Sequence, residues 1–420
     1  MSEIPGLGSR KAALRMLDAV LRRGEPLEHV QHAACQGLKR RDDRALAMVL
    51  AAEVLRNLAG LDALIDSATR QRLPDDAKAR MVLRLALIQA LKLGTPPHAA
   101  IATCLPLVMG GPKRLVHGVF GTLMRGEARL ADPVLPENVS SRWAKGWGDA
   151  IVGAAAQALA QLPPLDLGLR DPAATAIWAE RLGGESLMPG HVRLARSGAV
   201  EDLPGYGDGQ WWVQDLAAGL PARMLGDGKG RTVFDLCAAP GGKTMQLAAA
   251  GWKVVAVDKS VKRLERLRTN LERTGFEAEC VAADLLQWQP GDKADAILLD
   301  APCSATGIFR RHPDVLYRIG DDDIAALAEL QAQLLDRASG WLKPGGMLVY
   351  AVCSLEREEG ELQVQDFLRR HPEFEPCPPS AMPLPADVQA EAAKVRTLPG
   401  MLFEKGGMDG FFMARMRLVG

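Results

Sequence analysis

Cysteines and aspartates recur where short apolar runs in the C-terminal half of the chain end. Carboxyl ends of parallel strands gather at one edge of a sheet, and open α/β sheets bind their ligands there. We therefore expect these side chains to meet: Asp235, Cys237, Asp258, Asp284, Asp300, Cys303 and Cys353. Carboxylates and thiols gathered at one edge indicate a functional site in which a thiolate acts as a nucleophile.

A glycine turn, Pro240-Gly241-Gly242-Lys243, follows the first of these strands. A Walker A loop would need glycine at Cys237, and the dinucleotide fingerprint Gly-x-Gly-x-x-Gly is absent. S-adenosylmethionine carries no phosphate and needs a close backbone approach, which two glycines permit. We expect this cofactor, with Asp258 at the ribose hydroxyls and Asp284 near the adenine. Helix capping is the alternative role for either acid.

The thiols suit methylation of cytosine at C5. This carbon is a poor nucleophile until a thiolate adds to C6, and cysteine both attacks and leaves readily. An acid near N3 of the base favours the addition, and Asp300 stands at a suitable strand end. Spacing alone leaves open whether Cys303 or Cys353 attacks. The other cysteines are expected to be small buried apolar residues: Cys35, Cys104, Cys280 and Cys377.

Length and composition bound the class of protein. A chain of 420 residues predicts two or three domains, and 48% hydrophobic with 24% charged residues is typical of a globular protein. Seven cysteines without a Cys-x-x-Cys pair argue against a zinc site or a disulfide framework. We see neither a signal peptide nor the ~18 uncharged apolar residues of a membrane span. We expect a cytoplasmic monomer without metal or membrane partner.

The net charge of zero hides an asymmetry. Residues 1–130 carry a net charge of +8, residues 131–220 carry −5 and residues 221–420 carry −3. A basic N-terminal part is typical of a module that binds phosphates, although a helical domain with a solvated basic face would look the same.

Three domains are predicted from hydrophobic periodicity. Helical spacing runs through residues 9–128, which predicts an all-α bundle over 1–130. Prolines divide residues 131–220 into short segments, which we interpret as a small α+β connecting domain with strands over 173–182 and 188–198.

Strands and helices alternate from residue 221 onward. This pattern predicts a doubly wound, mostly parallel sheet over 221–420. Strands are expected over 232–239, 253–260, 280–287, 294–304, 342–355 and 410–418, with helices over 244–251, 260–275, 321–340 and 356–372.

Four motifs closely resemble the RNA 5-methylcytosine methyltransferases. They are Asp-Leu-Cys-Ala-Ala-Pro-Gly-Gly-Lys-Thr at 235–244, Asp-Ala-Pro-Cys-Ser-Ala-Thr-Gly at 300–307, Arg-Arg-His-Pro-Asp at 310–314 and Tyr-Ala-Val-Cys-Ser at 350–354. Trp-Trp-Val-Gln-Asp at 211–215 and Asp-Gly-Phe-Phe at 409–412 support the resemblance. The all-α N-terminal part is similar to the NusB-like RNA-binding domain of the bacterial subfamily that acts on small-subunit ribosomal RNA. The resemblance covers nearly the whole chain.

The resemblance implies a role for each matching residue in a Rossmann-like class I methyltransferase domain. Cys353 matches the nucleophile, Cys303 matches the cysteine that assists breakdown of the covalent adduct, and Lys243 would lie near Asp300 and Cys353. The matching cofactor contacts are Cys237, Ala238, Ala239, Pro240, Gly241, Gly242, Lys243, Asp258, Asp284 and Asp300.

Two observations qualify the match at the thiols. The family usually has threonine where this chain has Val352, a change that leaves the thiol in place. DNA cytosine-5 methyltransferases use the cysteine of a Pro-Cys pair, which here is Pro302-Cys303. The choice of Cys353 therefore rests on the resemblance.

RNA contacts are expected beside the thiols. Arg310, Arg311 and His312 are candidates to hold backbone phosphates, with a surface ion-pair cluster as the alternative. Trp211 and Trp212 are candidates to stack on a base or to pack against the sheet.

The sequence thus predicts transfer of a methyl group from S-adenosylmethionine to C5 of a cytosine in 16S ribosomal RNA, through a covalent adduct of cysteine with C6. A transfer RNA cytosine-5 methyltransferase is one alternative. A silent RNA-binding assembly or antitermination factor with a methyltransferase fold is another, although the intact pair Cys303 and Cys353 argues against it.

Overall fold

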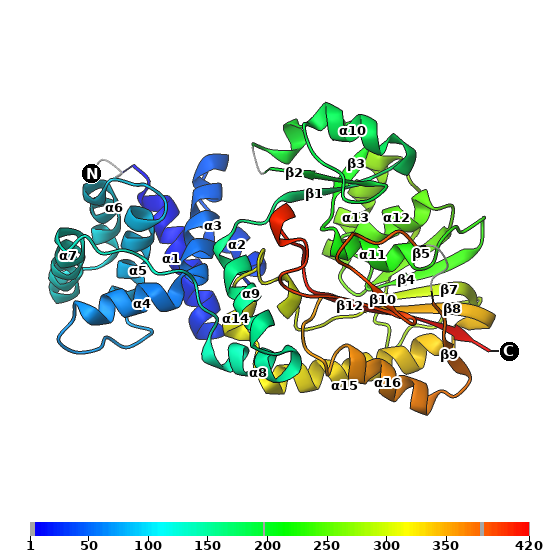
Figure 1. Cartoon of the computed structure of the whole chain (residues 1–420). Helices are drawn as coiled ribbons and strands as arrows, with labels where there is room; N and C mark the ends of the chain where they lie inside the picture. The colour runs from blue at the N-terminus through cyan, green and yellow to red at the C-terminus, as the bar shows by residue number, and fades with distance from the viewer. Residues whose placement is uncertain (1–4, 196–197, 379–381, 420) are drawn as a thin grey trace. The chain divides into compact units, whose positions relative to one another are not determined.

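The computed structural model describes residues 5–195, 198–378 and 382–419, which divide into two compact units (Figure 1). Unit 1 comprises Met1–Leu162 with Phe309–Ile319, and unit 2 comprises Pro163–Ile308 with Gly320–Gly420. The connecting domain that we predicted over 131–220 is therefore divided, because its first part lies in unit 1 and its strands lie in unit 2.

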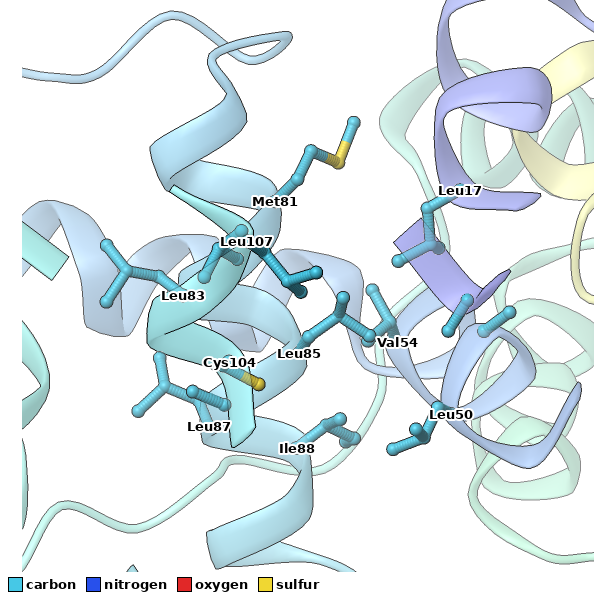
Figure 2. Packing of buried hydrophobic residues seen from close by; sticks show 14 of the residues in the cluster. Leu17, Leu50, Val54, Met81, Leu83, Leu85, Leu87, Ile88, Cys104 and Leu107 are labelled. Carbon is cyan, nitrogen blue, oxygen red and sulfur yellow. The ribbon is translucent and has the colours of Figure 1, made fainter. Parts of the chain in front are cut away.

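Unit 1 is helical throughout its described residues, which confirms the predicted all-α fold. Its helices are α1 Leu7–Arg23, α2 Leu27–Ala34, α3 Arg41–Arg56, α4 Leu58–Ser67, α5 Lys78–Leu91, α6 Pro97–Cys104, α7 Gly110–Arg125, α8 Glu137–Trp147, α9 Asp149–Ala160 and α14 Val315–Arg318. Helix α5 is buried over residues 79–89, so it is covered on every side. Figure 2 shows its Leu85 and Ile88 beside Leu50 and Val54 of α3.

A continuous helical pattern over residues 44–68 forms two helices instead of one. The break lies at Asn57, a buried residue whose side-chain amide donates to the carbonyl of Glu53 at 2.8 Å. The amide of an asparagine that bonds to a carbonyl of its own helix competes with the backbone N–H groups for that carbonyl. The break at Asn57 lets α3 and α4 each pack against α5.

The segment Phe309–Ile319 leaves the sheet after Ile308 and packs in unit 1. The ring of Phe309 lies 5.4 Å from that of Trp143 in α8. The hydroxyl of Tyr317 donates to the carbonyl of Leu55 in α3 at 2.7 Å, and a carboxylate oxygen of Asp314 accepts from the N–H of Leu27 at 3.3 Å. The segment that carries Arg310, Arg311 and His312 is therefore a structural part of unit 1.

Unit 2 contains the predicted doubly wound sheet. Its strands are β4 Thr232–Leu236, β5 Lys253–Asp258, β6 Glu279–Ala282, β7 Ala294–Asp300, β8 Leu342–Val352, β9 Phe374–Pro376, β10 Ala390–Glu391, β11 Lys394–Thr397 and β12 Phe411–Leu418. Within the described residues the order is β10-β11-β12-β8-β7-β4-β5-β6. Strands β8, β7, β4, β5 and β6 run parallel, and β12 is antiparallel to β8. The predicted fold class is confirmed.

Helices cover both faces of this sheet (Figure 1). One face packs on α15 Asp321–Ser339 and α16 Glu361–Arg370, and the other on α11 Leu220–Arg223, α12 Gly242–Ala249 and α13 Val261–Thr274. Neighbouring residues of β7 alternate between the two cores, since Ile297 and Leu299 face one and Ala296 and Leu298 the other. Burial on both faces leaves the strand ends as the open edge.

A smaller antiparallel sheet precedes the main one. It has the order β2-β1-β3, from β1 Leu165–Leu169, β2 His191–Leu194 and β3 Trp211–Val213. The strand predicted over 188–198 is confirmed in part by β2, and residues 196–197 of that prediction lie outside the described residues. The strand predicted over 173–182 is wrong, because Thr175–Leu182 forms helix α10, which buries Trp178 against this sheet and ends at Gly183.

No helix of the described residues is long and apolar enough to cross a membrane.

The ion pairs of two buried arginines with Asp62 are predicted to stabilise unit 1. The carboxylate of Asp62 accepts two bonds of 2.8 Å from Arg84 and lies 3.0 Å from Arg80, and these two arginines are 2% and 0% exposed. Removing it leaves the buried Arg84 without its carboxylate partner, while Arg80 keeps its ion pair with Asp66. Asp62→Ala should therefore lower the free energy of unfolding of unit 1 by about 3 kcal/mol.

Hydrogen exchange of the α5 amides measures this free energy. Asp76→Ala is the control, because its carboxylate is 62% exposed and lies 3.9 Å from Arg22; it should cost about 0.5 kcal/mol or less. Equal exchange rates in the two variants would contradict the assignment.

Candidate active site

The loop after β4 carries the glycine turn and brings its backbone against neighbouring elements. Gly241 has φ +105°, and a Cβ at this residue would lie 2.9 Å from Leu267 of α13. Glycine is therefore required both for its backbone conformation and for close packing. The turn ends where α12 begins at Gly242, which places Lys243 in the first turn of that helix.

Lys243 and Asp300 form an ion pair at this edge. The ammonium nitrogen lies 2.8 Å from a carboxylate oxygen, and Lys243 is buried. Burial alone would lower the pKa of Lys243, but the charge and hydrogen bond of Asp300, with a contribution from Cys353, raise it above its ordinary value. Lys243 therefore keeps its positive charge in the ion pair with Asp300.

The two strand-end cysteines face each other. The sulfur of Cys303, after β7, lies 3.5 Å from that of Cys353, after β8. Contact with Cys353 and then burial raise the pKa of Cys303 well above that of an ordinary thiol. Cys303 therefore holds its proton at neutral pH. The contact between the two sulfur atoms is not visible in their spacing along the chain.

Backbone contacts fix the thiol-bearing loops. The N–H of Gly307 donates to the carbonyl of Cys353 at 3.0 Å, and the N–H of Gly410 donates to the carbonyl of Gly307 at 2.9 Å. A Cβ on Gly307 would lie 1.9 Å from the Gly410 oxygen, which is impossible without movement. The sequence motifs at 300–307, 350–354 and 409–412 therefore meet at this contact.

The acids predicted for the ribose and adenine lie at the ends of β5 and β6. Asp258 is 2% exposed, and its carboxylate accepts from the N–H groups of Ala239 at 3.2 Å and Ser260 at 2.9 Å. Asp284 is exposed and accepts from the N–H of Leu286 at 2.9 Å. Asp258 therefore orders the loop after β4, and direct cofactor contacts of both acids remain predictions.

A cavity of about 510 Å³ opens between this loop and the segment that follows β3. Its lining includes Ala238, Ala239, Pro240, Gly242, Lys243, Asp300, Trp212, Gln214 and Asp215. The volume suits a small ligand. The carboxylates of this lining include Asp215 and Asp300, which suit the ammonium group and hydroxyls of S-adenosylmethionine and would repel phosphates. Asp258 and Asp284, which we predicted for the ribose and adenine, are not among its lining residues.

Other predicted residues lie away from solvent. Trp211 and Trp212 are 0% and 2% exposed, and their indole N–H groups donate to Pro204 and Gln214, so they pack in the interior. Arg310 is 3% exposed and lies in unit 1, as do the half-buried Arg311 and His312. Phosphate contacts by the three remain a prediction.

Sequence reasoning gave no role to two buried carboxyl groups. Asp235 is 0% exposed; it accepts a bond of 2.5 Å from the hydroxyl of Thr244, and burial raises its pKa to about 7. Glu359 is also 0% exposed and contacts the serines after both cysteines. Its position in the charged run 356–361 is typical of a solvated segment, so no sequence signal marked it.

The sheet, the glycine turn and the acids at the strand ends define a Rossmann-like methyltransferase. A family model described as 16S rRNA methyltransferase RsmB/F matches residues 222–417, and one described as NusB family matches residues 8–110. Ribosomal RNA small subunit methyltransferase B of Klebsiella pneumoniae subsp. pneumoniae is 36% identical over 439 residues, which cover 97% of each chain. The protein of the same name from Xanthomonas campestris pv. campestris is 33% identical over 436 residues, again 97% of each chain.

The chain therefore belongs to the RsmB/F family of ribosomal RNA methyltransferases. S-adenosylmethionine is the cofactor of this family, and the predicted NusB-like domain is confirmed.

Solved structures show the same fold. The crystal structure of PH0851 has a TM-score of 0.75 at 22% identity and covers 99% of both chains. NSun6 from Pyrococcus horikoshii, solved with SFG, has a TM-score of 0.59 at 20% identity; the match covers 68% of this chain and 98% of that one.

The raised pKa of Asp235 predicts a pH-dependent stability. The unfolded carboxyl ionises near its ordinary pKa of 3.8 and the folded one near 7, so its stabilising effect is complete below pH 3.8 and is lost as the pH rises to 7. The slope is about 1.4 kcal/mol per pH unit. Asp235→Asn cannot ionise and should unfold at higher urea than the parent at pH 8, with the difference shrinking toward pH 4.

Asp227→Asn is the matched control, since Asp227 is exposed. The assignment fails if Asp235→Asn and the parent protein lose stability equally between pH 4 and pH 8.

Proposed function

We propose that this protein transfers a methyl group from S-adenosylmethionine to C5 of a cytosine in 16S ribosomal RNA, through a covalent adduct between Cys353 and C6. The observation that carries the proposal is the pair of thiols 3.5 Å apart beside the ion pair of Lys243 and Asp300. Acyl or phosphoryl transfer would not need a second thiol in contact with the first, whereas C5 methylation must also remove a proton from the base.

The proton on Cys303 supports Cys353 as the nucleophile. Contact with Cys353 and then burial raise the pKa of Cys303, which disfavours Cys303 as the attacking thiolate. Only a thiolate attacks efficiently. Lys243, whose own pKa is raised partly by Cys353, supplies a positive charge near the attacking sulfur. The DNA-type assignment to Cys303 is therefore disfavoured.

The residues divide the reaction between them. The sulfur of Cys353 bonds to C6, which makes C5 nucleophilic, and Asp300 and Lys243 stabilise the charge that moves onto the base. S-adenosylmethionine supplies the electrophilic methyl group when bound. The C5 proton must then leave, so that the C5–C6 double bond re-forms and the Cys353 thiolate departs.

Cys303 can take part in this last step because its environment changes during the reaction. The sulfur of Cys353 bears no charge while it is bonded to carbon, so the largest influence that raises the pKa of Cys303 is removed. The Cys303 thiol can then give its proton to water, and the resulting Cys303 thiolate takes the proton from C5 as the C5–C6 double bond re-forms and the Cys353 thiolate departs. This is the role in adduct breakdown that the resemblance implied.

Unit 1 is proposed to bind RNA. It contains the basic residues 1–130 and the match to the NusB family. Exposed cations include Lys11 and Arg15 on α1 and Lys113 and Arg114 on α7, which suit backbone phosphates. Arg310, Arg311 and His312 remain candidates for such contacts, and of the three the side chain of Arg310 is buried.

Cysteine variants test the two thiol roles. Cys353→Ala should lower methylation of 16S RNA by about 10⁴-fold or more, since it removes the nucleophile. Cys303→Ala should still attack and methylate but release RNA slowly, so a covalent complex should accumulate on denaturing gels. Cys280→Ala, a half-buried cysteine outside the pair, is the control and should be normal. A complex trapped by Cys353→Ala but not by Cys303→Ala would reverse the assignment.

Bisulfite sequencing of RNA from a deletion strain tests the target. We expect loss of 5-methylcytosine at one position of 16S RNA, restored by the parent protein but not by Cys353→Ala. Loss at a transfer RNA position would favour the transfer RNA alternative, and no loss would favour a silent RNA-binding factor. Either result would contradict the proposal.

A further inference from the structure

Glu359 lies between β8 and α16, where its side chain is completely buried. One carboxylate oxygen accepts from the N–H of Ser304 at 2.9 Å and from the amide nitrogen of Gln331 at 3.0 Å. The other accepts from the hydroxyls of Ser304 and Ser354, each at 2.5 Å. Four donors therefore converge on this one group.

The two serines adjoin the two thiols. Ser304 directly follows Cys303, and Ser354 directly follows Cys353. A single rigid carboxylate thus bridges the loops after β7 and β8 at the residues next to the sulfur atoms. The backbone bond from Gly307 to Cys353 joins the same loops on another side.

The surrounding groups hold Glu359 in place. The hydroxyl of Tyr350 donates to the Glu359 carbonyl at 2.6 Å, and Gln331 of α15 also donates to the carbonyl of Pro302 at 3.0 Å. Burial of a carboxylate is unfavourable unless donors satisfy it, and burial raises the pKa of Glu359 against the effect of its donors. An apolar side chain would fill this space without that cost, but it could not join two hydroxyls and two N–H groups.

We propose that Glu359 is a positioning residue, which holds Ser304 and Ser354 and thereby sets the distance between the sulfur atoms of Cys303 and Cys353. Its catalytic consequence rests on the proposed function, since close approach of the thiols matters only if both act. Its effect on the distance between the two sulfur atoms does not depend on the proposed function. A shift of about 1 Å in a reacting group can cost about 100-fold in rate.

Three variants separate positioning from general stability. Glu359→Ala removes all four bonds. Glu359→Gln keeps the shape: its oxygen can accept from Ser304 and Gln331 while its amide donates to the two hydroxyls, which can rotate. Glu358→Ala is the matched control, because Glu358 is the exposed neighbour of Glu359.

The first measurement is steady-state methylation together with cofactor affinity. Glu359→Ala should lower kcat by about 100-fold, with Kd for S-adenosylmethionine and KM for RNA nearly unchanged. Glu359→Gln should recover most of the rate, and Glu358→Ala should match the parent. A parent-like kcat in Glu359→Ala would overturn the proposal. So would equal loss of kcat and cofactor binding in Glu359→Ala and Glu359→Gln, because that pattern indicates only a damaged fold.

The second measurement tests how close the sulfur atoms of Cys303 and Cys353 lie, and it does not require methylation. Diamide, an azo oxidant, takes two electrons and two protons from Cys303 and Cys353, which form a disulfide as diamide is reduced to the hydrazine. Mass spectrometry should detect rapid cross-linking in the parent, Glu359→Gln and Glu358→Ala proteins, and its loss in Glu359→Ala. Unchanged cross-linking in Glu359→Ala would overturn the proposal even if the parent methylates no RNA. Loss of cross-linking with an inactive parent would count against the proposed function alone.

Discussion

The backbone of Gly307 lies against the carbonyl of Gly410, and its N–H donates to the carbonyl of Cys353. No other residue fits at this contact, since a Cβ would lie 1.9 Å from the Gly410 oxygen. Strands β7, β8 and β12 are neighbours in the sheet, so their ends can close on one another in this way. That closure joins the loops that carry Cys303 and Cys353.

Burial decides the electrostatics of the site. Lys243 and Asp300 compensate each other in a place where either charge alone would be costly. Contact with Cys353 and then burial raise the pKa of Cys303, so it is kept as a thiol. Burial raises the pKa of Asp235, near the end of β4, to about 7. The same low polarity that strengthens each of these interactions disfavours ionisation of the Cys303 thiol.

The sequence predicted correctly those side-chain neighbours that follow from the parallel arrangement of the strands. Parallel strands bring their carboxyl ends together, so the meeting of Lys243, Asp300 and the two thiols followed from strand–helix alternation and the family motifs. It failed where long-range packing decides: Glu359 resembles its exposed neighbours along the chain, and the segment Phe309–Ile319 gives no sign that it packs in unit 1. Helix α10 was mistaken for a strand because a short apolar run fits both periods.

The most direct test of the account is the chemical position of the transferred methyl group. The protein should be incubated with 16S RNA and S-adenosylmethionine carrying a trideuterated methyl group, and the RNA digested to nucleosides for mass spectrometry. The account predicts labelled 5-methylcytidine in reactions with the parent protein and none with Cys353→Ala. Label on the ribose, on the exocyclic amine or on another base would contradict it, as would labelled 5-methylcytidine formed without the Cys353 thiol.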